Sequence, residues 1–230
     1  MRVSSATLSP VNGAAWVLMA LFVAVAALDW LAVHFRSTAV EYLAKPGCMV
    51  VLTAAAVAME PDDRSARVLL VVALVCSTTG DVFLMLPPRP PGAGGLDRFV
   101  AGLAAFLLAH VAYGVAFVLV GVRLGWMVLG LVAAVVIVAT IGQRVVAAVR
   151  VSPDPAMTAP VTAYLAVISM MVATAIGTAD PRAIAGALLF AGSDSLIAWG
   201  RFVRSQPWFP IAIIVTYHLA QALLVLSFSG

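Results

Sequence analysis

Long apolar stretches alternate with short polar breaks along the whole chain. The breaks, such as "RVSPDP" at 150–155 and "TADPR" at 178–182, combine proline with charged residues, a composition typical of loops between helices. A helix that spans a membrane needs about 20 apolar residues. The pattern predicts eight such helices, at residues 14–35, 39–59, 67–86, 98–121, 125–146, 158–177, 182–200 and 209–228. We therefore expect an all-α polytopic membrane protein in which residues 1–230 form a single integral membrane domain.

The composition excludes a soluble globular protein. The chain is 63% hydrophobic and 10% charged, with a mean hydropathy of +1.10, whereas a soluble domain is about half apolar and a quarter charged. The net charge of +3 is therefore no sign of a nucleic-acid partner, and we expect membrane lipids around the protein instead. The first apolar stretch follows Arg2 and resembles a signal peptide, but it is long enough to span, so we expect no cleavage. The predicted location is the cell membrane.

A trace of internal duplication is visible. Pro46 is followed by Asp81 after 35 residues, and Pro160 is followed by Asp194 after 34 residues. Each pair falls on the second and third predicted helix of its half of the chain. The spacing suggests two parallel four-helix repeats, an arrangement known from membrane transporters.

Ionisable side chains within the predicted spans are the candidate functional residues, because a charge is costly in hydrocarbon and is kept there mainly for function. At a rise of about 1.5 Å per residue, Asp81 and Asp194 lie roughly 8–9 Å from the same end of their helices. Lys45 and Tyr217 lie at comparable depths from that end. We therefore expect a cavity that opens to one face of the membrane. The ionisable set is Asp29, Lys45, Asp81, His110, Asp194 and His218, with Tyr113, Tyr217 and Gln221 beside them.

Structural roles are the alternatives for several of these residues. Asp81 or Asp194 forms a structural ion pair with Lys45 or His110 in that interpretation. Asp29 and His34 would then simply reach the membrane interface, and His218 would be a core histidine bonded to the backbone. Lys45 would extend its ammonium group to the lipid headgroups.

Two common types of catalytic site are not indicated. The segment "AGSDS" at 191–195 resembles the Gly-x-Ser-x-Gly motif of serine hydrolases only loosely, and it falls inside a helix rather than on a strand-to-helix turn. No His-Glu-x-x-His motif is present, and we expect neither a metal ion nor another cofactor. Two buried carboxylates in different environments can instead divide the roles of acid and base between them.

Five segments resemble the YhhN family of membrane proteins: "KP" at 45–46, "GDVFLML" at 80–86, "FVAGLAAFLLAHVAYGVAF" at 99–117, "GALLFAGSDSLIAWGRF" at 186–202 and "YHLAQALL" at 217–224. The resemblance implies eight membrane helices. It also implies hydrolysis of the vinyl ether bond of lysoplasmalogens, which are lysophospholipids, to a fatty aldehyde and a glycerophospho-base. The aspartates thought to be catalytic in this family fall on Asp81 and Asp194. The candidate substrate-binding residues are Lys45, His110, Tyr113, Tyr217, Gln221 and Ser193.

The chemistry of a vinyl ether suits two aspartates. Protonation at carbon gives an oxocarbenium ion, water adds to it, and the resulting hemiacetal collapses to aldehyde and alcohol. This needs a neutral acid, a carboxylate near the cation and a base for water. We favour Asp194 as the acid, because Lys45 is expected to keep Asp81 ionised. The alternatives are a small lipid or amphiphile transporter and a non-enzymatic lipid-binding membrane protein.

Overall fold

The computed structural model describes residues 13–59, 63–87 and 97–229, and its regular secondary structure is helical. A π-helical turn, η1 (Val138–Gly142), joins α5 to α6, and a 3₁₀ turn, η2 (Pro155–Met157), precedes α7. With these joined, eight helical stretches of the described chain are long and apolar enough to cross a membrane. The α-helices are α1 (Gly13–His34), α2 (Thr38–Ala58), α3 (Arg64–Met85), α4 (Arg98–Val120), α5 (Leu124–Ile137), α6 (Gln143–Arg150), α7 (Thr158–Gly177), α8 (Pro181–Phe202) and α9 (Phe209–Ser227).

The predicted all-α architecture and its eight spans are confirmed. The largest difference is in the fifth span, which contains the π-helical turn η1 and continues to Arg150 rather than ending at residue 146. The proline-rich break at 87–95 lies almost entirely outside the described residues, as does Arg2. The proposed pair of four-helix repeats stays a prediction.

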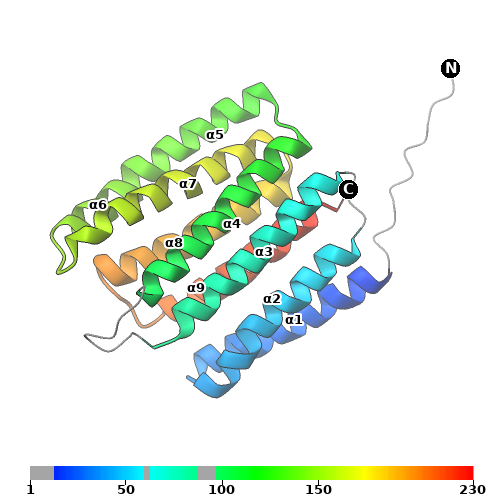
Figure 1. Ribbon diagram of the computed structural model, residues 1–230, viewed down its shortest axis with the longest axis horizontal. Coiled ribbons are helices and arrows are strands. Elements are labelled where there is room, and N and C mark those ends of the chain that lie inside the picture. Colours follow the sequence, from blue (N-terminus) through cyan, green and yellow to red (C-terminus); the bar gives the residue numbers. More distant parts are fainter. Residues whose placement is uncertain (1–12, 60–62, 88–96, 230) are drawn as a thin grey trace.

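Seven of the described helices form a closed ring. Each packs against the next in the order α1, α2, α3, α4, α7, α8 and α9, and α9 returns to α1. α5 lies outside this ring against α7, while α6 also contacts α8. Figure 1 shows α1 and α2 along one flank of the bundle and α5 with α6 along the opposite flank. The ring leaves an interior into which side chains from distant parts of the sequence converge.

Acidic residues in the polar breaks start three of the helices. The side chains of Asp63, Asp97 and Asp180 each accept hydrogen bonds from two backbone N–H groups in the first turn of α3, α4 and α8, respectively. Such caps satisfy N–H groups that have no partner within the helix. These aspartates therefore have a structural role at the helix ends, unlike those inside the spans.

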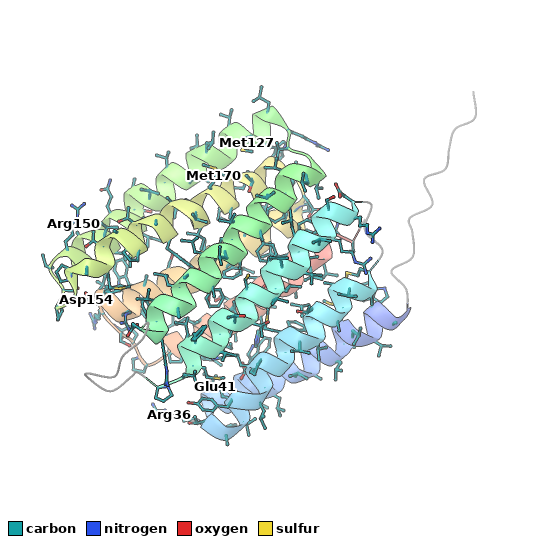
Figure 2. All side chains as sticks on the ribbon, viewed as in Figure 1. Arg36, Glu41, Met127, Arg150, Asp154 and Met170 are labelled. Carbon is teal, nitrogen blue, oxygen red and sulfur yellow. The ribbon has the colours of Figure 1, made fainter. Side chains whose placement is uncertain are left out.

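The outer surface of the bundle is apolar. Leu43, Leu124 and Val17 are 78%, 82% and 69% exposed, respectively, far more than large apolar side chains of a soluble protein would be as a group. In Figure 2, Arg36, Glu41, Arg150 and Asp154 lie at one end of the bundle, away from the apolar middle. The chain is thus a multi-pass membrane protein whose lipid-facing side chains surround a packed interior.

Gly130 allows α5 to lie directly on the backbone of α7. A Cβ atom at this position would be 2.3 Å from the carbonyl oxygen of Ala173, whereas one at Gly125 of the same helix would meet nothing within 4 Å. Small residues at such crossings let membrane helices approach closely. We expect Gly130→Ala to destabilise the protein by about 1–3 kcal/mol, as overpacking commonly does. Thermal unfolding in detergent tests this, with Gly125→Ala as the matched control; equal melting temperatures for the two variants would contradict it.

Candidate active site

A cavity of about 700 Å³ lies within the helix ring and contains both aspartates. Asp81 and Asp194 line it together with residues of the α1–α2 and α8–α9 connections, among them Arg36 and Pro207. The α8–α9 connection follows the C-terminal end of α8, the end near which Asp194 lies, as Asp81 lies near the C-terminal end of α3. The structure therefore brings the two carboxylates from α3 and α8 to one space, at the end of the bundle that the sequence predicts.

Asp81 is 8% exposed, and its Oδ2 accepts a hydrogen bond of 2.6 Å from the hydroxyl of Tyr217 on α9. The preceding residue, Gly80, has a packing role. A Cβ atom there would lie 2.5 Å from Cδ2 of Phe106, so only glycine lets this ring pack directly against α3. Phe106 also lines the cavity.

Asp194 is held by side chains from two other helices. The hydroxyl of Tyr164 on α7 donates a short hydrogen bond to its Oδ2. The same oxygen lies 3.5 Å from Nε2 of His110 on α4. The other ring nitrogen of His110, Nδ1, lies 2.5 Å from the backbone carbonyl oxygen of Phe106.

This geometry determines where protons must lie. Nδ1 of His110 faces a carbonyl oxygen, which only accepts, so Nδ1 must carry hydrogen. In a neutral imidazole Nε2 is then a bare lone pair that points towards Asp194. Nε2 has no hydrogen-bond partner among the described residues, and a lone pair beside a carboxylate is repelled by it, so a proton on the carboxyl of Asp194 or on Nε2 is favoured. Asp194 is thereby placed beside a proton that it can deliver to the cavity.

Lys45 lines the cavity, but its ammonium group is already paired. Nζ donates to Oε1 of Glu41 at 2.7 Å, one turn earlier on α2. Arg36 and Arg201 also line the cavity, and the guanidinium of Arg201 lies 3.7 Å from the ring centroid of Phe99. The cavity lining therefore carries three cationic side chains, of which Lys45 is paired with Glu41 in the same lining.

Three other candidate residues take different places. Ser193 lines the cavity, and its hydroxyl donates to the carbonyl oxygen of Ile213 at 3.1 Å. Tyr113 donates to Oε1 of Gln221 at 2.5 Å, and both side chains are fully buried and are not among the residues that line the cavity. Contact of Tyr113, Gln221, His110 or Ser193 with a substrate stays a prediction.

The third intramembrane aspartate does not reach the membrane interface, which corrects one of the structural alternatives. Asp29 is 0% exposed, and its Oδ2 lies 3.9 Å from Nε2 of His218. Nδ1 of His218 accepts a hydrogen bond of 3.0 Å from Nε1 of Trp30, so this core histidine is bonded to a side chain and not to the backbone. The cluster of Asp29, Trp30 and His218 lies outside the cavity lining.

Two residues of the site were not singled out from the sequence. Glu41 precedes Lys45 by four residues, a spacing that places two side chains on one helix face, so a signal was present. Tyr164 lies 30 residues from Asp194 along the chain, and nothing in its apolar surroundings marks it. Among the described residues, no group of three or more His, Cys, Asp or Glu side chains could hold a metal ion; metal-independent activity stays a prediction.

Comparison with known proteins identifies the family. The family model for YhhN matches residues 40–228. The chain belongs to the YhhN family. Two proteins named lysoplasmalogenase, from Mycobacterium bovis and Mycobacterium tuberculosis, are each 38% identical to it over 184 residues, which are 78% of this chain and 67% of the relative. The human protein named lysoplasmalogenase TMEM86B is 33% identical over 159 residues, 69% of this chain and 62% of the relative. No solved structure gives a significant match.

The YhhN match begins within α2, so α1 and Asp29 lie outside it. It includes α3, α4, α7, α8 and α9, which carry Asp81, His110, Tyr164, Asp194 and Tyr217. The part of this YhhN chain that matches the family model therefore contains both carboxylates of the cavity and the side chains that hold them.

Proposed function

We propose that the protein hydrolyses the vinyl ether bond of a lysoplasmalogen and releases a fatty aldehyde and a glycerophospho-base. One observation carries the proposal: Asp81 and Asp194 line a single cavity inside the bundle. The relatives named lysoplasmalogenase support the same reaction. The proposed location of the protein is the cell membrane, where we expect a lysophospholipid to enter the cavity from one leaflet.

In the proposed reaction Asp194 is the general acid. Its carboxyl proton passes to the vinyl carbon that is not bonded to oxygen, and the adjacent C–O unit becomes an oxocarbenium ion. The geometry between Asp194 and His110 supports this assignment, because it keeps one proton at Oδ2 or Nε2. Tyr164 supports the carboxylate that remains, since its hydroxyl donates to Oδ2.

Asp81 is proposed to stabilise the cation and then to accept a proton from the attacking water. Its carboxylate is held by the Tyr217 hydroxyl, and a fixed negative charge beside a developing cation lowers the barrier without reorganisation. The hemiacetal then loses its hydroxyl proton to Asp194, while the glycerol oxygen takes the proton that Asp81 accepted from water. The water supplies the oxygen of the aldehyde, and its second proton restores the acid at Asp194.

A transporter is less well supported, because the bundle is packed behind the two aspartates. Phe190, Tyr113 and Phe117 are almost completely buried. The rings of Tyr113 and Phe117 are stacked with centroids 6.5 Å apart, and Phe117 stacks on Phe228 at 5.3 Å. A pathway through the membrane would have to open this packed aromatic layer, whereas hydrolysis needs access from one side only.

Hydrolysis in D₂O tests the proposed chemistry. Because the acid delivers its proton to carbon, we expect one deuterium at carbon 2 of the aldehyde. Immediate reduction of the aldehyde to the alcohol, followed by mass spectrometry, measures this incorporation. Unlabelled aldehyde carried through the same incubation corrects for exchange. Product without deuterium above that control would contradict protonation at carbon.

Lys45 is proposed to bind the substrate phosphate together with the arginines at the cavity mouth. A lysine binds phosphate as a point charge, and the side chain of Lys45 lines the cavity. We expect Lys45→Met to raise KM several-fold while kcat falls less, because the contact is the same in the ground state and the transition state. Steady-state kinetics measures this. A fall in kcat at unchanged KM would contradict phosphate binding and indicate that Lys45 acts on Asp81.

A further inference from the structure

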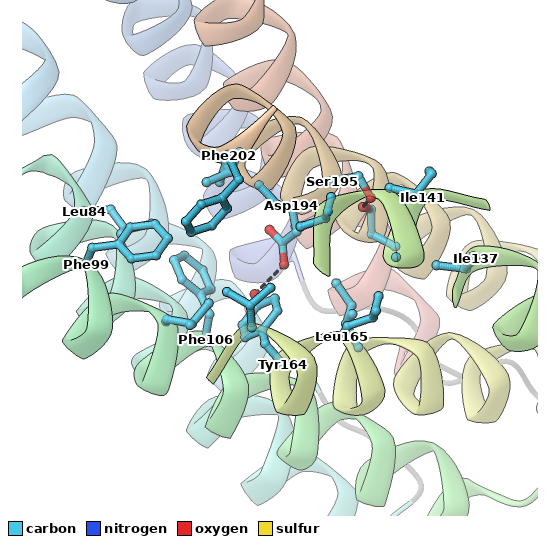
Figure 3. A pocket seen from close by; sticks show the side chains of 18 residues that line it. Leu84, Phe99, Phe106, Ile137, Ile141, Tyr164, Leu165, Asp194, Ser195 and Phe202 are labelled. Atoms are coloured by element: carbon cyan, nitrogen blue, oxygen red, sulfur yellow. Dashed lines mark hydrogen bonds between the residues drawn. The ribbon is translucent and has the colours of Figure 1, made fainter. Parts of the chain in front are cut away.

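A second, apolar pocket adjoins the cavity on the side of α7 and the fifth span. It lies between α4, α7, α8 and the α5–η1–α6 span, and its volume is about 80 Å³. Nearly all of the side chains that line it are apolar. Figure 3 shows the bond between Asp194 and Tyr164 in the middle of this pocket, with Leu84, Phe99 and Phe106 on one side and Ile137, Ile141 and Leu165 on the other.

The two spaces share a wall, and Asp194 is part of it. Leu84, Phe99, Phe106, Asp194 and Ile197 line both the polar cavity and the apolar pocket. Asp81 lines only the polar cavity. Glu41, like Asp81, lines only the polar cavity. Among the carboxylates of the two linings, Asp194 is thus the one that lies at the boundary between the polar cavity and the apolar pocket.

We propose that the apolar pocket binds the hydrocarbon chain of the substrate beyond the vinyl ether, while the polar cavity holds the glycerophospho-base. This inference rests on the proposed function, and it adds the subsite for the chain. A vinyl ether joins a polar headgroup to a hydrocarbon chain. A substrate that lies across the shared wall would therefore present this bond to Asp194.

The π-helical turn η1 contributes one wall of the pocket. Ile141 and Gly142 belong to it and line the pocket. A Cβ atom at Gly142 would lie 2.4 Å from Cδ2 of Leu165 on α7, so this wall is closely packed. π-helical turns within α-helices occur frequently at functional sites, and here the turn shapes the pocket beside Asp194.

The size of the pocket limits how much of the hydrocarbon chain it holds. The centre of one water-sized group occupies about 10–15 Å³. On the same measure the pocket offers about 80 Å³, which is room for roughly six such groups. Because a methylene is of similar size, the pocket takes the first part of a fatty chain and excludes a headgroup. We expect the rest of a long chain to extend from the pocket into the surrounding lipid.

Photo-crosslinking tests the location of the chain without any need for hydrolysis. The probe is a lysophospholipid with a saturated ether bond and a diazirine on the sixth chain carbon, offered to the full-length protein in lipid nanodiscs. After irradiation, mass spectrometry is expected to find the label within residues 137–145 and 161–168. An excess of unlabelled ether lysolipid should remove it. Label spread evenly over the outer surface of the bundle would overturn the proposal.

Two variants sharpen this test. Ile141→Trp fills the pocket from η1 and is expected to abolish the specific label, whereas Val135→Trp, at a position that is 66% exposed on α5, should keep it. Leu165→Trp fills the pocket from α7 and provides a second test if Ile141→Trp does not fold. Specific label that survives both pocket variants would overturn the proposal.

A diacyl phospholipid with the same diazirine distinguishes the substrate chain from a bystander lipid. It should not label the pocket residues, because its second chain does not fit the subsite; equal labelling would overturn the assignment. The crosslink and the reaction can fail separately. A protein that crosslinks the lysolipid but releases no aldehyde would refute the proposed hydrolysis and leave the lysolipid subsite standing.

Discussion

Asp194→Asn should lose vinyl ether hydrolysis by about 10²–10⁴-fold in kcat, the usual contribution of a general acid. The replacement has nearly the same shape. With its amide oxygen at the position of Oδ2 it can still accept from Tyr164, so the one hydrogen bond that the Asp194 side chain makes there is kept. What the amide cannot do is transfer a proton to carbon. Aldehyde release by the purified variant measures the loss.

Asp29→Asn is the matched control for that substitution. Like Asp194, Asp29 is an aspartate near a histidine within the membrane, but it is fully buried and lines neither the cavity nor the apolar pocket. We expect this variant to keep turnover within a few-fold of the unmodified protein. If Asp194→Asn retains near-normal turnover while its melting temperature is unchanged, Asp194 has a structural role and the proposed acid is wrong.

Asp81→Asn should cause a loss of the same order, about 10²–10⁴-fold in kcat, for a different reason. The amide is neutral, so it neither stabilises the oxocarbenium ion nor accepts a proton from water. Tyr217→Phe provides the comparison, because it removes the hydroxyl that donates to Asp81 and leaves the carboxylate in place. Its loss should be much smaller.

Single-turnover and steady-state kinetics of these two variants separate the roles of charge and position. Equal losses in Asp81→Asn and Tyr217→Phe would mean that the position of the side chain matters and its charge does not. A normal rate in Asp81→Asn would contradict the two-carboxylate mechanism altogether.

Much of the fold could be predicted because a membrane imposes a length on apolar stretches. The proline and acidic residues of the breaks gave nearly correct bounds, since Asp63 and Asp180 cap the helices that follow. The π-helical turn η1 could not be predicted. Its sequence, "VATIG", is compatible with a regular helix, and the α7 residues that it packs against lie in a later part of the chain.

The buried carboxylates of the site could be predicted from the sequence, but the side chains that pair with them could not. A carboxylate within an apolar span is conspicuous, so Asp81 and Asp194 could be found from the sequence. Their tyrosine partners come from other helices, and the sequence gives no distance between helices. Asp29 is equally conspicuous, yet the structure places it away from the cavity. Composition along one helix therefore reveals which polar residues are buried, while the helix ring decides which of them meet.

The most direct test of the central claim is aldehyde release by the purified protein from three lipids that differ in one bond. They are a lysoplasmalogen and its ester and saturated alkyl-ether analogues, with the same headgroup and chain length. The account predicts stoichiometric fatty aldehyde from the vinyl ether and no cleavage of the other two, because only the vinyl ether becomes an oxocarbenium ion on protonation at carbon. Cleavage of the ester, or no aldehyde from the vinyl ether, would contradict it.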